Sequence, residues 1–254
     1  MNRPEQLHER LDAIGRSLES SGKALALIGL GSVGVETARA DRYSDLDFYA
    51  VVRPGHKAEF LGDLRWMSAA HPVAWCFQNT PHGYKLLYED GIFCELEVYE
   101  PDELLKVRYA EGRFVWKARD CDESLRIPAQ ETADRQERSV GWSVGELVTN
   151  LYVGLCRYRR GEKLSAYRFV QGYAVERVMD LLPHVMTPEP VHRDPFGRER
   201  RIEQQYPDMT ADFASFMQGY ERTPESALSL LRWVERHFDV NPAMRRLVEE
   251  LCLR

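Results

Sequence analysis

The sequence predicts an α/β (α+β) domain followed by an all-α domain, and two observations lead to this prediction. Up to about residue 125 the chain contains six short apolar runs of β character, separated by helical patterns and turns. After Pro128, apolar residues recur at helical spacing almost to the end of the 254-residue chain. We therefore expect one domain over residues 1–125 and a helical-bundle domain over residues 126–254.

The first domain is expected to be a sheet with helices between its strands. Helical patterns cover residues 1–20 and 56–70, and a short one begins at Pro101. The strands are expected in runs rich in β-branched and aromatic residues. In chain order these runs are KALALIGL, LDFYAVV, VAWCFQ, YKLLYED, IFCELEVYE and FVWKARD.

The second domain is expected to consist of helices joined by one long loop. Apolar residues at helical spacing predict helices over residues 137–160, 165–182, 224–238 and 242–252. The Pro- and charge-rich stretch PHVMTPEPVHRDPFGRER separates the second helix from the third. Such a stretch is typical of a loop.

The composition limits the classes of function. Hydrophobic residues make up 44% of the chain, enough for a substantial core, and the net charge of −6 makes a long polyanion such as nucleic acid an unexpected partner. No apolar run approaches the ~18 residues of a membrane span, and the charged N-terminus does not resemble a signal peptide, so a cytoplasmic protein is expected. The five scattered cysteines are expected to be buried hydrophobic residues rather than disulfide or zinc ligands.

The segment GLGSVG, residues 29–34, follows the first apolar run and spells G-x-G-x-x-G. A dinucleotide-binding turn has this pattern, but it also needs a long crossover helix and an acidic residue at the end of the next strand. Here the following segment VETARADRYS is short, and Asp45 and Asp47 come at the start of the next run. A dinucleotide site stays an alternative that a bound nicotinamide or flavin would support.

The D-L-D sequence at residues 45–47 suits a metal site. Alternate side chains of a strand share a face, so Asp45 and Asp47 point the same way, about 6.5–7 Å apart, while Leu46 points into the core. Two such carboxylates can hold or bridge Mg²⁺ ions, whose remaining ligands are waters and phosphates. Upstream, the backbone at Gly31 and the hydroxyl of Ser32 can approach a phosphate closely. The alternative is a solvated turn with one capping aspartate.

A third carboxylate is available in the run GIFCELEVYE. Glu95 and Glu97 alternate with apolar residues and therefore share one face of the expected strand. They either complete the metal site or belong to a strand whose one side faces solvent. From this strand alone, both interpretations stay open.

These motifs resemble the signature of the nucleotidyltransferase superfamily related to DNA polymerase β. The signature consists of an apolar strand, then Gly31-Ser32, then Asp45-Leu46-Asp47 entering a strand, then Glu95 between apolar residues. The runs IGLGSVG, RYSDLDFYAVV and FQNTPHGYKLLYEDGIFCE are most similar to the lincosamide antibiotic nucleotidyltransferases. The resemblance covers mainly the first hundred residues and implies a mixed sheet; the helical half matches only in architecture.

The resemblance implies transfer of a nucleoside monophosphate from a Mg²⁺-bound triphosphate to a hydroxyl of a small-molecule antibiotic, with release of pyrophosphate. By this implication Asp45 and Asp47 bind two catalytic metal ions, and Glu95 completes the metal site or acts as general base. Gly31 and Ser32 hold the triphosphate. Homodimers are common in such a family, so a homodimer is a further expectation.

Several cations are candidates for binding the triphosphate. Arg39 and Arg42 lie between the Gly31-Ser32 pair and the aspartates, and Lys85 shares a face with Leu87 in its strand. In the helical half, Lys163 and Arg168 lie near an expected helix–helix turn. For each of these residues the alternative is a solvated surface charge or a favourable charge at a helix end.

Three other functions stay open beside modification of a lincosamide. The acceptor is alternatively an aminoglycoside, a polycation for which Glu95, Glu97 and Glu100 are available, or a protein, as in a toxin–antitoxin system. A nucleotide-binding module without catalysis is the alternative from a different class. The intact set of acidic residues argues against it.

Overall fold

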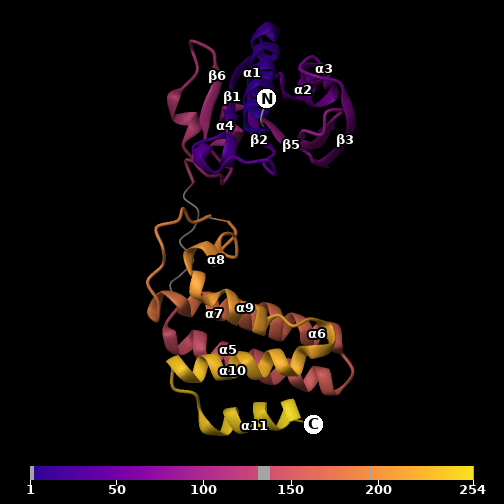
Figure 1. Ribbon diagram of the computed structural model, residues 1–254. Coiled ribbons are helices and arrows are strands. Elements are labelled where there is room, and N and C mark those ends of the chain that lie inside the picture. Colours follow the sequence, from indigo (N-terminus) through magenta and orange to yellow (C-terminus); the bar gives the residue numbers. More distant parts are fainter. Residues whose placement is uncertain (1–2, 131–137, 195, 254) are drawn as a thin grey trace. The chain divides into compact units, whose positions relative to one another are not determined.

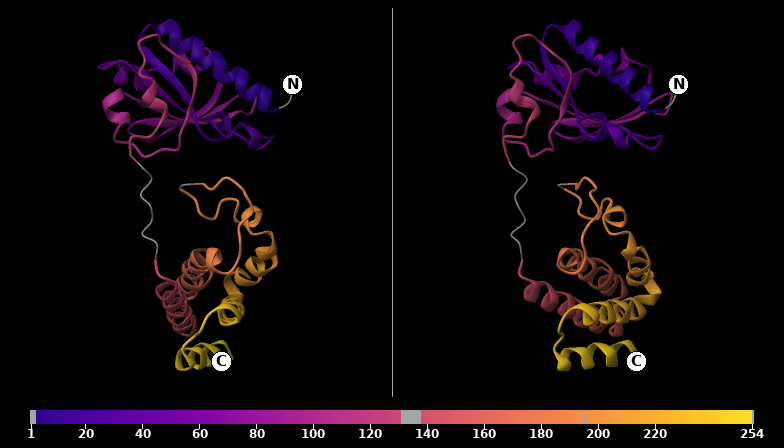
Figure 2. Two further views of the ribbon diagram at one scale, coloured as in Figure 1. Left: turned by 90° about the vertical axis from the view of Figure 1, so that its left-hand side faces the viewer. Right: turned by 60° about the vertical axis from the view of Figure 1, so that its left-hand side comes forward.

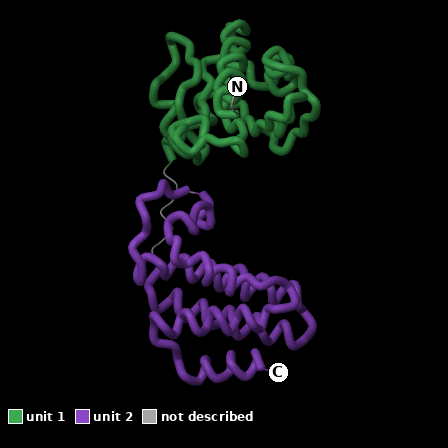
Figure 3. The backbone as a smooth tube through the Cα atoms, viewed as in Figure 1, with its two compact units in different colours: residues 1–133 green, residues 134–254 purple. Residues whose placement is uncertain are grey.

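The computed structural model describes residues 3–130, 138–194 and 196–253, and the chain divides into two compact units. The first unit is Met1–Ala133 and the second is Asp134–Arg254 (Figure 3). Leu125 lies in the 3₁₀ helix η3 (Glu123–Arg126) and is buried in a core of the first unit, which therefore continues past residue 125.

The first unit is built on one six-stranded mixed sheet (Figure 1). All six apolar runs form strands, in the spatial order β3-β4-β5-β2-β1-β6. Only the pair β2 and β5 is parallel; the other neighbours are antiparallel. The strands are β1 (Ala24–Gly29), β2 (Leu46–Val52), β3 (Val73–Thr80), β4 (Gly83–Tyr88), β5 (Phe93–Tyr99) and β6 (Arg113–Lys117).

One face of this sheet is covered by helices. The long helix α1 (Arg3–Ser21) lies along that face (Figure 2) and buries Leu7, Leu11, Ile14 and Leu18, which recur at helical spacing. The short helices α2 (Lys57–Gly62) and α3 (Arg65–Ser68) add Phe60, Trp66 and Met67 to the same core. The inward side chains of β2 and β5 complete it, among them Phe48 and Cys94.

The opposite face carries Asp47, Tyr49, Glu95 and Glu97, and we call it the acid face. Near Tyr49 it is covered by a smaller core that includes Leu104 of α4 (Pro101–Leu104). The alternation expected for D-L-D is confirmed, since Leu46 is fully buried among the residues beneath α1 and Asp47 is half-buried on the acid face. The helix cover on one face thus leaves the acidic side chains on the other.

The second unit is helical, as expected. Its long helix α5 (Val140–Arg159) begins after Ser139, whose hydroxyl accepts a hydrogen bond from Trp142 N. Residue 137, where this helix was expected to begin, lies outside the described residues. The second expected helix is a continuous run of α6 (Lys163–Arg168), the π-helical η4 (Phe169–Ala174) and α7 (Val175–Leu181).

The remaining helices close the core of the second unit. They are α8 (Ile202–Gln205), α9 (Thr210–Phe216), α10 (Thr223–His237) and α11 (Pro242–Leu253). The short α8 and α9 lie in a region for which the sequence predicted no helix. Buried apolar residues of α5, α7, α9 and α10 form one core, in which the fully buried Trp233 lies edge to face with Phe216. Among the residues described, no helix is long and apolar enough to cross a membrane.

One cysteine contradicts the expectation of burial. Cys94 and Cys121 are buried, and Cys156 and Cys252 are partly buried, but Cys76 is exposed. The reason is its position on β3, an edge strand whose side chains from Ala74 to Asn79 are all exposed, whichever face they point to. All five cysteines are free thiols.

Candidate active site

The carboxylates of Asp47 and Glu95 lie on neighbouring strands at the same level. β2 and β5 run parallel, and Asp47 is the register partner of Glu95. Directly opposed residues of a ladder point to the same face, with Cα atoms about 5 Å apart. Two residues that are far apart in the sequence and were expected to share one site are therefore brought together by the sheet.

Asp45 stands just before β2, two residues ahead of Asp47, and is half-buried. Its position and carboxylate oxygens suit a hard cation such as Mg²⁺, as do those of Asp47 and Glu95. Within the described part of the chain, however, no three His, Cys, Asp or Glu side chains gather closely enough to hold a metal ion. Glu95 instead accepts a hydrogen bond from Lys85 Nζ, 2.9 Å from its Oε1. A metal site of Asp45, Asp47 and Glu95 stays a prediction.

The glycine-rich turn lies against Asp47. Leu30 N donates to Asp47 O at 2.8 Å, and Gly31 opens the 3₁₀ helix η1 (Gly31–Val33) with a φ of +52°. A Cβ at Gly31 would be 2.8 Å from Arg39 Nη2 and 3.9 Å from Asp47 Oδ2. Glycine therefore both adopts the left-handed conformation and leaves room for the Arg39 guanidinium beside the backbone, with Asp47 in ordinary contact distance.

The same turn excludes the dinucleotide alternative. A Rossmann-type turn begins a crossover helix that returns to a parallel strand. Here the connection contains only η1 and a second 3₁₀ helix, η2 (Thr37–Arg39), and β2 runs antiparallel to β1. A Cβ at Gly34 would lie 2.6 Å from Gly29 O, so the turn folds back tightly on its own strand.

The two arginines that follow the turn differ in position. Arg39 is partly buried beside Gly31 and forms an ion pair with Glu36. Arg42, the residue expected to bind nucleotide, is exposed, and its guanidinium lies 4.6 Å from the ring centroid of its neighbour Tyr43. Of Arg39 and Arg42, Arg39 is the one whose side chain lies at the glycine turn.

Arg113, the first residue of β6, is a further residue of this site that was not predicted from the sequence. Its guanidinium donates to Val33 O at 3.0 Å and to Gly34 O at 3.3 Å, and so holds the carbonyl groups of the glycine turn. No local signal marks this residue, because the contact exists only where β6 pairs with β1. Its role is to position the turn.

Glu97 belongs to a cluster of tyrosines on the acid face. Tyr99 donates its hydroxyl hydrogen to Glu97 Oε2 at 2.8 Å, and Thr80 Oγ1 is 3.3 Å from the other oxygen. Burial, together with the charge of Glu97, raises the pKa of Tyr99 well above its ordinary value. The ring of Tyr49 meets those of Tyr99 and Tyr109 edge to face, and burial raises the pKa of Tyr109 to about 12. These hydroxyls therefore stay protonated, and Tyr99 serves as a donor to Glu97.

The two cations expected in the helical half have partners within the second unit. Lys163 Nζ lies 2.5 Å from Glu221 Oε2, and the Arg168 guanidinium lies 5.7 Å from the ring centroid of Tyr173. The two units are described separately, so nucleotide-binding roles for Lys163 and Arg168 stay predictions.

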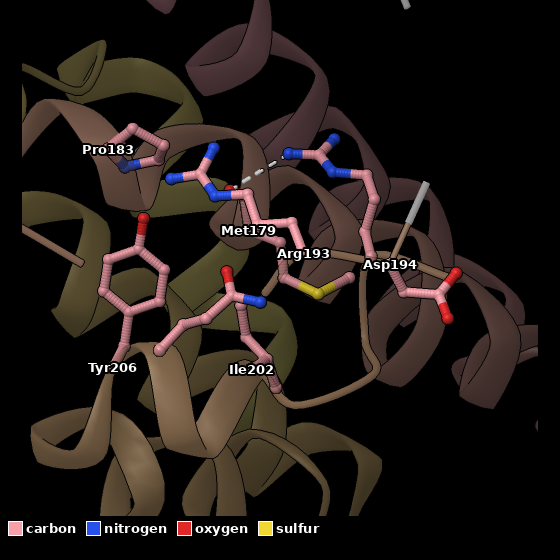
Figure 4. A pocket seen from close by; sticks show the side chains of 8 residues that line it. Met179, Pro183, Arg193, Asp194, Ile202 and Tyr206 are labelled. Carbon is pink, nitrogen blue, oxygen red and sulfur yellow. Dashed lines mark hydrogen bonds between the residues drawn. The ribbon is translucent and has the colours of Figure 1, made fainter. Parts of the chain in front are cut away.

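The second unit also has a pocket of about 80 Å³ that none of the expected site residues lines (Figure 4). Asp194 at its rim accepts hydrogen bonds from Phe196 N and Gly197 N, both at 2.9 Å, and pairs with Arg200 at 2.6 Å. These contacts fix the path of the loop before α8.

The chain was compared with known proteins. No protein-family model matches it, and no curated protein matches it in sequence. Among solved structures it is similar to an aminoglycoside 6-adenyltransferase from Bacillus subtilis, at 11% identity and a TM-score of 0.36, over 97% of this chain and 91% of that one. At this level of similarity, a functional proposal depends on the geometry of the chain itself.

Proposed function

We propose that this protein is a Mg²⁺-dependent nucleotidyltransferase that moves a nucleoside monophosphate from a nucleoside triphosphate to a hydroxyl of a small-molecule antibiotic, and so confers resistance. One observation carries the proposal. Asp47 and Glu95 are opposed in register on one sheet face, and the glycine turn at Gly31 lies directly against Asp47. A phosphate-binding turn beside paired carboxylates is what transfer from a metal-bound triphosphate needs.

The roles of the residues follow from this arrangement. Asp45, Asp47 and Glu95 would hold Mg²⁺, which supplies neutralising charge for the phosphates when it is bound. The N–H groups of Gly31 and Ser32 and the Ser32 hydroxyl would bind phosphate oxygens, since Leu30 N, Val33 N and Gly34 N donate within the fold. Arg39, beside Gly31, adds positive charge to the same place.

The reaction is a single displacement at the α-phosphorus. The acceptor oxygen forms a bond to this phosphorus while the bond to the bridging oxygen breaks, so that pyrophosphate leaves with the electron pair. The proton of the acceptor hydroxyl passes to a carboxylate oxygen of Glu95, which acts as general base. Before the reaction, Oε1 of Glu95 accepts a hydrogen bond from Lys85 Nζ.

We propose a lincosamide such as lincomycin or clindamycin, rather than an aminoglycoside, as the acceptor. An aminoglycoside carries several positive charges and needs several available carboxylates. Glu97 is bound by Tyr99, and Glu100 Oε1 accepts from Gly55 N at 2.7 Å, so both are occupied within the fold. Beyond Lys85 the face presents the exposed aromatic side chains of Trp75 and Phe77, which suit an amphipathic sugar amide.

A pyrophosphate-release assay tests the proposal. The purified protein is given Mg²⁺, each of the four ribonucleoside triphosphates, and clindamycin or kanamycin in separate wells. We expect release that requires clindamycin, stops when EDTA removes Mg²⁺, and falls by about three orders of magnitude in Asp47→Asn.

The variant needs a control for folding, and its unfolding midpoint in urea should stay close to that of the unchanged protein. Pyrophosphate release that depends on kanamycin and not on clindamycin would show that the acceptor is an aminoglycoside. If the protein binds triphosphate but releases no pyrophosphate with either drug, an antibiotic acceptor would be excluded and a protein acceptor favoured. Absence of Mg²⁺-dependent triphosphate binding would overturn the proposed function.

A further inference from the structure

Two large aromatic side chains stand exposed on the edge strand β3. Trp75 is 49% exposed and Phe77 is 55% exposed, and their rings stack with centroids 6.2 Å apart and an interplanar angle of 28°. β3 has the sequence VAWCFQNT, without a charged residue or a proline. Edge strands usually carry such residues as protection against unwanted pairing, so an exposed aromatic pair here indicates a binding surface.

The sheet register places this pair on the acid face. Phe77 opposes Lys85, Lys85 opposes Glu95, and Glu95 opposes Asp47, so the four side chains form one row across the sheet. A second row beside it runs from Trp75 through Leu87 to Phe93. The acid face therefore changes, from β2 to β3, from carboxylates to an apolar surface.

The position of the glycine turn decides which substrate this apolar surface receives. The turn follows β1, which lies on the far side of β2 from β5, β4 and β3. In an in-line displacement the attacking and leaving oxygens lie on opposite sides of the transferred phosphorus. With the triphosphate on the β1 side of Asp47, the acceptor approaches from the β3 side.

The spacing of the strands sets the size of that acceptor. Neighbouring strands are about 4.8 Å apart, so Phe77 lies about 10 Å from Glu95 across the sheet. A molecule that places one hydroxyl at Glu95 and an apolar part on the aromatic pair needs two linked rings. Sugar rings present C–H groups on a flat face, and such faces pack well on aromatic rings.

We propose that Trp75 and Phe77 form the platform that holds the acceptor, an amphipathic molecule of two linked rings whose reactive hydroxyl lies at Glu95. The proposal rests on the proposed function for the identity of the reaction, but binding to the platform is measurable without catalysis. Trp75 and Phe77 would then determine the specificity for the acceptor, from a part of the acid face that has no carboxylates.

Calorimetric titration with clindamycin, in the absence of nucleotide, provides the first test. We expect Trp75→Ala and Phe77→Ala each to raise the Kd for clindamycin roughly tenfold, because stacked aromatic contacts contribute on that order. Gln78→Ala is the matched control, since Gln78 is exposed on the same strand but opposes Tyr84 on the other face. This control should keep the Kd of the unchanged protein.

Steady-state kinetics provides the second test. The KM for clindamycin should rise by a similar factor in both aromatic variants, with the KM for the triphosphate changed less than about twofold. A rise in the triphosphate KM alone would overturn the proposal, because the pair would then bind the nucleoside base. Conversion of a dimer into a monomer by Trp75→Ala in size-exclusion chromatography would also overturn it, because a second copy would then cover the pair.

The two proposals fail in distinguishable ways. Weakened clindamycin binding in the variants, without pyrophosphate release by the unchanged protein, would keep the platform and overturn the proposed reaction. Full clindamycin-dependent release with unchanged binding in both variants would keep the reaction and overturn the platform. If the unchanged protein fails to bind clindamycin at millimolar concentration, the platform is overturned whatever the assay shows.

Discussion

The acid face holds its two glutamates in different ways, although they stand only two residues apart on β5. At one end, Glu95 opposes Asp47 and contacts Lys85, and its side chain is 44% exposed. At the other end, Glu97 is bound by Tyr99 and Thr80 among buried aromatic rings. An alternating sequence pattern therefore predicts the sheet face on which a carboxylate lies. The residues on the neighbouring strands determine whether that carboxylate is available for chemistry.

Replacing the glutamates one at a time tests whether Glu95 and Glu97 differ in their importance for catalysis, and it should give the largest effect. We expect Glu95→Gln to lower kcat by about 10²–10³, because an amide neither accepts the proton nor neutralises a cation. Glu97→Gln should stay within about threefold of the unchanged protein. The measurement is drug-dependent pyrophosphate release at saturating substrates. Equal losses in both variants would show that the two ends act as one site.

The next largest effect is expected at the glycine turn. Arg39→Met should raise the KM for the triphosphate about tenfold, because it removes a partly buried cation beside Gly31. Arg42→Met is the matched control, since Arg42 is exposed and stacks on Tyr43. We expect less than a twofold change there, in line with the small contribution of exposed charges. A larger rise in the triphosphate KM for Arg42→Met than for Arg39→Met would show that Arg42 contacts the phosphates.

The cluster of Glu97 and its neighbouring tyrosines is expected to contribute to the free energy of unfolding rather than to catalysis. Glu97→Gln weakens a charge-assisted hydrogen bond from Tyr99, so we expect the free energy of unfolding to fall by about 1 kcal/mol. Urea unfolding measures this change, and Tyr99→Phe removes the donor as a control. Because both variants remove the same bond, the double variant should lose less than the sum of the single losses. Strict additivity would show that the bond contributes nothing.

The smallest expected effect concerns Lys85. Its ammonium lies 2.9 Å from Glu95 Oε1, where it would compete with the proposed Mg²⁺ for that oxygen. Lys85→Met should therefore lower the Mg²⁺ concentration for half-maximal activity about threefold, a size typical of a half-exposed ion pair. Titration of Mg²⁺ at saturating triphosphate measures it. A higher Mg²⁺ requirement would instead make Lys85 a ligand of the phosphates.

Much of the first unit could be predicted because its signals are local. The six apolar runs have β composition, and the alternation of Asp45, Leu46 and Asp47 is a property of any strand. The helices of the second unit follow from apolar spacing in the same way, and α5 ends within one residue of its predicted end. The exposure of Cys76 was missed, because β3 carries neither the charged residues nor the proline that usually mark an edge strand.

The sequence alone therefore predicted most of the elements, though not α8 and α9, as well as the faces on which the acidic side chains lie and the glycine turn before them. The tertiary structure decided which residues become neighbours: Asp47 with Glu95, Arg39 with Gly31, Glu97 with Tyr99, and Phe77 with Lys85. It also decided that β2 returns antiparallel to β1, which excludes a dinucleotide turn. The physical reason is that side-chain direction repeats every two or 3.6 residues along the chain, whereas strand order and register depend on pairing between distant segments.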